Sequence, residues 1–325
     1  MFKTARLKLT AWYLLIIMFI SLSFSGLIFQ IVSREINRFA RAPRFRVEEN
    51  FLFNEDLVVE ARHRVLLSLL EINGLILLTA GSLGYFLAGK TLKPIEAVLE
   101  EQKRFIGDAS HELRTPLTAL KSMLEVSLRD KKITLPEAKS IISDSLEETD
   151  KLTSLSNSLL ELARLDGDTK KLVREKLLVK DLVADSFKQI TLRAQAKNIS
   201  ITSRTNSTQV FGNREKLVET LIILLDNALK YSPSGSQINI SAQTIKNTAL
   251  IKVSDHGAGI SSSDLPHIFE RFYRADIARS KNNKDGFGLG LSIAQKIIEE
   301  HKGKIEVKSK LGQGSEFKVT LPLFS

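Results

Sequence analysis

The sequence predicts an α+β protein with three parts: two apolar helices, a helical hairpin, and a C-terminal two-layer sandwich of helices on a mixed sheet. Residues 9–33 and 65–89 are almost free of charge, which predicts the apolar helices. Residues 91–166 repeat apolar side chains at spacings of three and four, which predicts the hairpin. Residues 237–245 and 249–254 alternate between apolar and polar side chains, as in strands with one covered face.

Each apolar stretch is long enough to cross a lipid bilayer. Residues 9–33 carry no charged side chain, and residues 65–89 carry one, Glu71. A helix of about 25 residues is roughly 37 Å long, which exceeds the roughly 30 Å hydrocarbon core. We therefore expect a membrane domain over residues 1–90, with two spans joined by a short loop, residues 34–64. The alternatives are a pair of buried soluble helices and, for the first stretch, a signal peptide.

Glu71 lies about two turns into the second apolar stretch. A carboxylate at that depth is a candidate functional residue, and the alternative is a carboxyl group that faces a partner helix. Gly74, Gly81 and Gly84 on the same helix would permit close helix packing under either interpretation.

Composition excludes several classes of site. The chain has no cysteine, so disulfide scaffolds, thiolate metal sites and cysteine nucleophiles are ruled out. The net charge is +10, and residues 167–325 hold 25 basic and 16 acidic side chains, which suits a polyanionic ligand. No recognition motif for nucleic acid is present, so we expect no nucleic-acid partner. His256, His267 and His301 lack metal-ligand spacing and are predicted to be structural.

The hairpin of residues 91–166 is predicted from two apolar seams. Two such hairpins would close a four-helix bundle in a dimer. A capping box with the sequence T-L-P-E at residues 134–137 marks the start of the second helix. The seams are formed by Ile106, Ala109, Leu113, Leu117, Leu120 and Leu124 and by Ile142, Leu146, Leu152, Leu155, Leu159 and Leu162.

One histidine of the hairpin is expected to face solvent. His111 lies two residues before Leu113, or about 200° around the helix, and therefore points away from the seam. Thr115 lies one turn further along the same face, and Glu112 is adjacent. An exposed imidazole beside a carboxylate can act as a nucleophile, although most surface histidines are only solvated.

Residues 105–118 resemble the phospho-acceptor box of sensor histidine kinases, with the core H-E-x-x-T-P at residues 111–116. The resemblance implies that His111 accepts a phosphoryl group and that Glu112 is its acid/base partner. It also implies that Thr115 helps to position water for a phosphatase activity.

The C-terminal part, residues 167–325, carries three clusters suited to a nucleotide. Residues 226–231 (D-N-A-L-K-Y) offer an amide oxygen for Mg²⁺ and an ammonium group for phosphate. Residues 255–259 (D-H-G-A-G) follow a strand, where a buried aspartate can accept a hydrogen bond from an exocyclic amine. Residues 286–291 (G-F-G-L-G-L) open a helix, whose free N–H groups can bind phosphates. Predicted helices cover residues 180–196, 214–230 and 289–301, and late strands cover residues 304–309 and 316–321.

The three clusters follow one another in this order, with Phe269, Phe272 and Tyr273 between the last two. Together with these aromatic residues, the clusters resemble the N, G1, F and G2 boxes of histidine-kinase ATPase domains. The resemblance covers residues 91–325 and implies ATP and Mg²⁺ as cofactors, with Asn227 as the metal ligand. It implies a lid over the phosphates in the loop that contains Arg279, Lys281 and Lys284. The nucleotide-binding residues that it implies are Asn227, Lys230, Tyr231, Asp255, Gly257, Gly259, Ile260, Arg274, Gly286, Gly288, Leu289 and Gly290.

Three features depart from the family pattern. Ile223 stands where the N box commonly has Asn, and an apolar side chain cannot bind Mg²⁺. Asn213 stands where the family often has Asp. Residues 91–95 resemble the start of a HAMP relay domain, but Pro94 is only 17 positions before His111. We therefore expect the second span to continue directly into the hairpin as one helix.

These features together predict a membrane-bound, homodimeric sensor histidine kinase. ATP would phosphorylate His111, and the phosphoryl group would pass to an aspartate in the receiver domain of a separate response regulator. Nucleotide chemistry places the domains at residues 91–166 and 167–325 in the cytoplasm, although the loop carries seven arginines against six acidic residues. Sensing is expected within the membrane or through a membrane partner protein. The alternatives are a mechanical ATPase and a non-catalytic scaffold.

Overall fold

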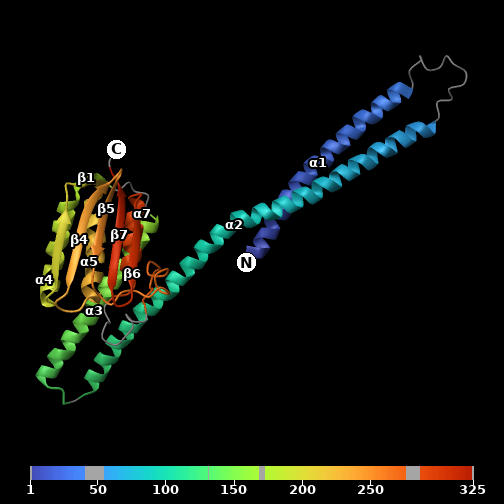
Figure 1. Cartoon of the computed structure of the whole chain (residues 1–325). Helices are drawn as coiled ribbons and strands as arrows, with labels where there is room; N and C mark the ends of the chain where they lie inside the picture. Colours follow the sequence, from blue (N-terminus) through green and yellow to red (C-terminus); the bar gives the residue numbers. More distant parts are fainter. Residues whose placement is uncertain (1, 41–54, 131, 168–172, 276–285, 324–325) are drawn as a thin grey trace, which may run out of the picture. The chain divides into compact units, whose positions relative to one another are not determined.

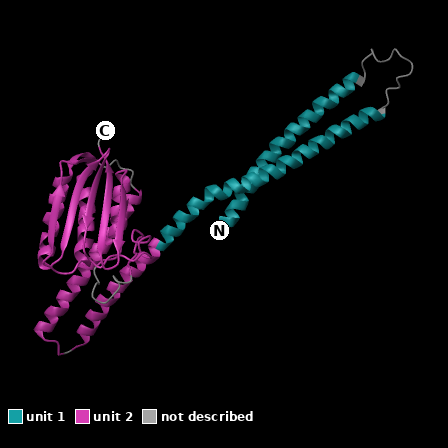
Figure 2. Cartoon of the chain, viewed as in Figure 1, with its two compact units in different colours: residues 1–104 teal, residues 105–325 magenta. Residues whose placement is uncertain are grey.

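The computed structural model describes residues 2–40, 55–130, 132–167, 173–275 and 286–323 (Figure 1). The chain divides into two compact units, residues 1–104 and residues 105–325 (Figure 2). The lid residues Arg279, Lys281 and Lys284 lie outside the described residues, as do residues 41–54 of the loop between the two apolar stretches.

The first unit holds helix α1 (Phe2–Ala40) and the N-terminal part of helix α2 (Glu55–Arg129). Both helices extend beyond the predicted spans, because the charged residues that flank each apolar stretch also take helical conformation. Most of the large apolar side chains on these helices are exposed, among them Trp12, Phe19 and Leu78. Two helices are thus long and apolar enough to cross a membrane.

Polar contacts join the two helices of this unit along one face of α2. Asn73 is only 6% exposed; its amide donates to the hydroxyl of Ser25 at 2.8 Å and accepts from that of Ser21 at 2.6 Å. Nearer the N-terminus, Arg6 donates through Nε to the carbonyl of Tyr85 at 2.9 Å and covers its ring at 3.6 Å. These contacts fix which face of α2 is turned toward α1.

The hairpin is formed by the C-terminal part of α2 and by helix α3 (Leu135–Gly167). Helix α2 is unbroken from Glu55 to Arg129, so the second apolar stretch continues into the hairpin without a relay domain, as predicted. The capping box holds the start of α3: the Glu137 carboxylate accepts from the Thr134 N–H at 2.8 Å and from its hydroxyl at 2.7 Å. These two bonds lower the pKa of Glu137.

The C-terminal domain is a two-layer sandwich (Figure 1). A five-stranded sheet in the order β2-β4-β5-β7-β6 is antiparallel except for the parallel pair β2–β4, and helices α4, α5 and α7 cover one face. A separate ribbon pairs β1 with β3. The elements are β1 (Glu175–Leu178), α4 (Val179–Ala196), β2 (Ser200–Thr205), β3 (Gln209–Gly212), α5 (Arg214–Tyr231), β4 (Gln237–Ile245), β5 (Thr248–Ser254), α7 (Gly290–Glu300), β6 (Lys304–Lys310) and β7 (Gly314–Pro322).

Two apolar clusters organise the second unit. The larger lies between the sheet and its helices and includes Leu224 on α5 and Ile240 on β4, both almost fully buried. The smaller joins the hairpin to the C-terminal domain, because Leu155 and Leu162 of α3 pack against residues of α7 such as Ile293. The start of α7, where the nucleotide cluster of residues 286–291 lies, is thereby held against the hairpin.

Candidate active site

The predicted phospho-acceptor lies on the solvent side of α2. His111 is exposed, as its position in the helix predicted, and Glu112 beside it is half-buried. The Thr115 hydroxyl donates to the His111 carbonyl at 3.2 Å, so one helical turn connects the two side chains. Leu113 turns inward and packs with the smaller apolar cluster. The helix therefore presents an accessible imidazole with a carboxylate and a hydroxyl close by.

The predicted nucleotide residues surround one cavity of about 370 Å³. Its walls come from the C-terminal end of α5, the loop after β5 and the loop that opens α7. Eleven of the twelve predicted residues line it: Asn227, Lys230, Tyr231, Asp255, Gly259, Ile260, Arg274, Gly286, Gly288, Leu289 and Gly290. The volume is in the range of small-molecule sites.

Asp255 is held at the base of this cavity and is 8% exposed. Its Oδ1 accepts from the N–H groups of Gly257 at 2.8 Å and Ser315 at 3.3 Å. Burial raises the pKa of this carboxyl, against the lowering effect of those two bonds. Oδ2 has no partner within the described part of the chain and is left to accept a hydrogen bond from a ligand.

Gly257, the one predicted residue that does not line the cavity, fixes this aspartate instead. A Cβ at Gly257 would lie 2.5 Å from the carbonyl oxygen of Tyr231. Gly259 has φ +69°, and a Cβ there would lie 2.1 Å from the carbonyl oxygen of Lys310. Only glycine allows the loop to pass this close to neighbouring backbone.

The start of α7 forms another wall of the cavity. Leu289 precedes the helix, and its side chain makes no capping hydrogen bond, so first-turn N–H groups are available to an anion. Gly286, with φ +114°, passes close to the Lys230 ammonium group, since a Cβ there would lie 2.8 Å from Nζ. Lys230 and the first turn of α7 thus line the same cavity as the buried Asp255 carboxylate.

Two family models match this chain, each by sequence. "Histidine kinase-, DNA gyrase B-, and HSP90-like ATPase" matches residues 212–325, a description that also includes mechanical ATPases. "His Kinase A (phospho-acceptor) domain" matches residues 101–168, the segment that carries His111. The chain belongs to the sensor histidine kinase family.

Curated and solved relatives of this chain agree with that family. The sensor histidine kinase RppB of Synechocystis is 36% identical over 241 residues, which cover 74% of this chain and 53% of RppB. The chain spans about half the length of its curated relatives RppB and the sensor protein CiaH of Streptococcus pneumoniae. The histidine kinase AdeS of Acinetobacter baumannii is 26% identical with TM-score 0.55, over 66% of this chain and 98% of AdeS. The histidine kinase ThkA, solved with the response regulator TrrA, shares the fold at 22% identity and TM-score 0.57, over 66% of its chain and 74% of this one.

Sequence patterns did not reveal every residue at the cavity of this kinase. Ser154 and Ser158 of α3 also line it, although they lie far from the nucleotide motifs in sequence. Ser315 donates its N–H to Asp255, and a Cβ at its neighbour Gly314 would lie 2.1 Å from the Asp255 carbonyl oxygen. Nothing local in the sequence marks these positions, because tertiary packing brings them to the site.

Ile223 has a packing role in place of the amide that the family pattern predicts. It contacts both apolar clusters, and its Cγ2 would lie 3.2 Å from a Cβ at Gly290. The cavity therefore has an apolar wall beside Asn227, and Ile223 supplies no metal ligand. Asn227 is left as the amide oxygen donor on this helix.

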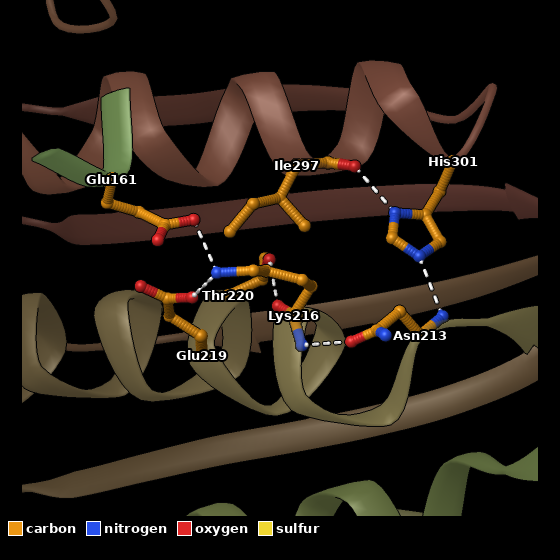
Figure 3. A network of polar contacts seen from close by, with 7 residues as sticks. All are labelled: Glu161, Asn213, Lys216, Glu219, Thr220, Ile297 and His301. Atoms are coloured by element: carbon orange, nitrogen blue, oxygen red, sulfur yellow. Dashed lines mark hydrogen bonds and ion pairs between the residues drawn. The ribbon is translucent and has the colours of Figure 1, made fainter. Parts of the chain in front are cut away.

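Asn213, the other departure, caps the start of α5. Its Oδ1 accepts from the Lys216 N–H at 3.0 Å, and its Nδ2 donates to the Val173 carbonyl at 3.2 Å. An ionised aspartate would make the first bond and not the second, because it has no donor. The Asn213 N–H also donates to Nε2 of His301 at 2.9 Å (Figure 3).

A charged network extends from this cap to the hairpin (Figure 3). The Lys216 ammonium group contacts Glu161 of α3 and lies 3.1 Å from Glu219. The Lys216 and Glu161 side chains are only 22% and 16% exposed. Burial alone would lower the pKa of Lys216, but the two carboxylates outweigh it and raise that pKa. The helix that carries Asn227 is thus tied to the hairpin at its other end.

The Lys216–Glu161 pair should contribute measurably to stability. We expect coupling of about 1–2 kcal/mol in a double-mutant cycle of Lys216→Met and Glu161→Gln. Lys216→Met leaves the largely buried Glu161 carboxylate without its ammonium partner, and Glu161→Gln leaves Lys216 with Glu219 alone. Urea unfolding of the detergent-solubilised chain measures the coupling. The matched cycle of Lys216→Met with Glu219→Gln should give less than about 0.5 kcal/mol. Equal coupling in the two cycles would contradict a special role for Glu161.

His301 should make stability depend on pH. It is 2% exposed; Nδ1 donates to the Ile297 carbonyl at 2.7 Å while Nε2 accepts from Asn213. Burial lowers the pKa of His301, so below its ordinary value of 6.5 the unfolded chain takes up a proton before the folded chain does. The free energy of unfolding should therefore fall as the pH drops from 6.5 toward the lowered pKa.

The check is thermal unfolding at pH 7.5 and pH 5.5. His301→Gln should lower the free energy of unfolding by about 1–2 kcal/mol at pH 7.5, because it disturbs two buried hydrogen bonds. Between pH 7.5 and pH 5.5, the free energy of unfolding of this variant should fall by less than that of the parent chain. His256→Gln on an exposed loop is the control and should keep the parent pH dependence. An unchanged pH dependence in His301→Gln would show that another group titrates.

Proposed function

We propose that this chain is a membrane-bound, homodimeric histidine kinase that transfers the γ-phosphoryl group of ATP to His111. The observation that carries the proposal is the combination of an exposed His111, with the half-buried Glu112 beside it, and a nucleotide-type cavity in the same chain. The two family models support both halves of that combination.

The cavity suits an adenine nucleotide with its phosphates toward α7. Oδ2 of Asp255 accepts from the exocyclic amine, and Lys230 with the first-turn N–H groups of α7 binds the phosphates. The Asn227 amide oxygen is a hard ligand of the type that Mg²⁺ takes, with water completing the shell. When bound, the metal neutralises phosphate charge and orients the γ-phosphoryl group.

The transfer itself uses two side chains of α2. A ring nitrogen of His111 forms a bond to the γ-phosphorus while the bond from phosphorus to the β–γ bridging oxygen breaks, and ADP leaves. The second ring nitrogen gives up its proton to Glu112, which restores a neutral phosphorylated ring. The half-buried Glu112 is held next to the imidazole by the helix.

An aspartate of a response regulator is the acceptor that we propose for the second transfer. The P–N bond breaks, an aspartate oxygen takes the phosphoryl group, and His111 regains a proton. The structure of ThkA with the response regulator TrrA supports such a partner for this fold. Thr115 then orients a water molecule for hydrolysis of the regulator's phosphoaspartate, which is the phosphatase activity.

The dimer and the membrane complete the proposal. Part of the predicted hairpin seam is exposed in a single chain, as for Ile106, Leu117 and Ile142, and a second hairpin would cover it as a four-helix bundle. The two apolar helices would span the cell membrane, with the kinase domains in the cytoplasm and the stimulus received within the membrane or from a partner membrane protein.

Membranes that contain the chain test this proposal when incubated with γ-labelled ATP. We expect label on the chain that is stable to base and labile to acid, and transfer of it to an added receiver domain. ATP hydrolysis with no labelled chain would instead favour a mechanical ATPase. Failure to bind nucleotide would favour a non-catalytic scaffold.

A further inference from the structure

Glu71 lies on the face of α2 that is turned away from α1. Asn73, two residues later, is buried against Ser21 and Ser25 of α1. Two residues correspond to about 200° around a helix, so Glu71 points nearly opposite to Asn73. The structure agrees, because Glu71 is exposed.

Glu71 and Ser68 stand out among the polar side chains of this apolar stretch. Asn73, Thr79 and Ser82 all make hydrogen bonds, either to α1 or to carbonyl groups one turn back. Ser68 and Glu71 lie one turn apart on the outward face and have no side-chain partner among the described residues. Within hydrocarbon, a carboxyl group without a partner is costly, so a further helix that supplies one would stabilise this face of α2.

The spacing of residues along α2 favours a second copy of the same chain as that helix. Glu71 and Leu78 are separated by whole multiples of seven residues from Ile106, an exposed residue of the hairpin seam. Leu75 is separated in the same way from Leu117 of that seam. A seven-residue repeat along one helix is typical of pairing along a single seam.

We propose that the outward face formed by Ser68, Glu71, Leu75 and Leu78 packs against the same face of a second chain. Around a two-fold axis each carboxyl group meets the Glu71 carboxyl and Ser68 hydroxyl of the second copy, which supply the missing hydrogen-bond partners. The inference rests on the proposed function, since it places this contact within the membrane-bound dimer. It assigns Glu71, whose role the sequence left open, to the interface between copies.

Single-cysteine cross-linking in membranes tests the contact, because the chain has no cysteine of its own. Leu75→Cys and Leu78→Cys should form disulfide-linked dimers on oxidation. Ile76→Cys and Ala80→Cys are matched controls on more covered parts of α2 and should cross-link much less. Leu124→Cys reports the hairpin dimer separately.

Glu71 variants in the Leu78→Cys background test the hydrogen bonds. Glu71→Leu should reduce the cross-linked fraction by about threefold to tenfold, whereas Glu71→Gln, which keeps a donor and an acceptor, should retain it. Two outcomes would overturn this inference and leave the dimeric kinase standing. One is cross-linking at position 124 with none at positions 75 and 78. The other is a Glu71→Gln variant whose cross-linked fraction is as low as that of Glu71→Leu. Absence of cross-linking at all three positions would count against the proposed dimer as well.

Discussion

Replacing His111 by glutamine should abolish ATP-dependent labelling of the chain. The expected loss is on the order of 10³-fold or more, the scale seen when a covalent nucleophile is removed from an enzyme. Glutamine keeps a polar side chain at an exposed helical position, so the fold should be unaffected. Incorporation of γ-labelled phosphate, separated on a gel under alkaline conditions, measures the effect.

Two controls make that result specific to His111. His63→Gln changes an exposed histidine outside both the hairpin and the cavity and should keep full labelling. Thr115→Ala should also keep labelling but slow the dephosphorylation of a phosphorylated regulator, because the proposed role of its hydroxyl lies in hydrolysis. Labelled His111→Gln protein would place the phosphoryl group on another residue.

Replacing Asp255 by asparagine should weaken nucleotide binding by about 30-fold to 100-fold. The change removes a charged acceptor, worth about 2–3 kcal/mol, and can turn an amide N–H toward the exocyclic amine of adenine. Asp255 lies at the base of the cavity with Oδ1 held by two backbone N–H groups, so only Oδ2 is left for a ligand. Titration with a fluorescent ATP analogue gives the dissociation constants.

Asp185→Asn is the matched control, because Asp185 pairs with Arg214 on the surface, away from the cavity. It should leave the dissociation constant within about twofold. Acidification gives a second check: burial raises the pKa of Asp255, so protonation should weaken binding at a higher pH than for an ordinary aspartate. Equal affinities of the Asp255→Asn and Asp185→Asn variants would remove Asp255 from the proposed site.

Local patterns in the sequence predicted the elements of the C-terminal domain that have one covered face. The strand predicted at residues 237–245 is β4, and the turn after it falls at Lys246, which takes φ 54°. The ribbon β1–β3 and the edge strand β2 were not predicted. They are short, β2 (Ser200–Thr205) is mostly polar, and their pairings join residues distant in sequence.

The sequence predicted those walls of the candidate cavity that are each formed by a single local motif. Asp255 and Gly259 share a loop, and Leu289 and Gly290 share a helix start, so their spacing along the chain fixes their spacing in space. Ser154 and Ser158 reach the same cavity from α3. Helix packing decides their position, and the sequence carries no local signal for it.

In the membrane unit, too, the local sequence predicted the helices, whereas the contacts between them required the structure. Stretches almost free of charge predicted both apolar helices, and the short distance from Pro94 to His111 predicted that α2 is continuous. Which polar residue faces which helix required the structure, because Glu71 and Asn73 differ by only two positions. Asn73 bonds to α1, and Glu71 is left on the outer face.

The central claim is that ATP phosphorylates His111, and mapping the modified residue tests it most directly. The full chain in membranes is incubated with ATP and Mg²⁺, digested at alkaline pH, and analysed by mass spectrometry with a fragmentation method that preserves P–N bonds. We expect one phosphorylated peptide, which contains residues 105–118 and carries the added mass on His111. Phosphate on a serine, threonine or aspartate, or ATP turnover without any modified peptide, would contradict the claim.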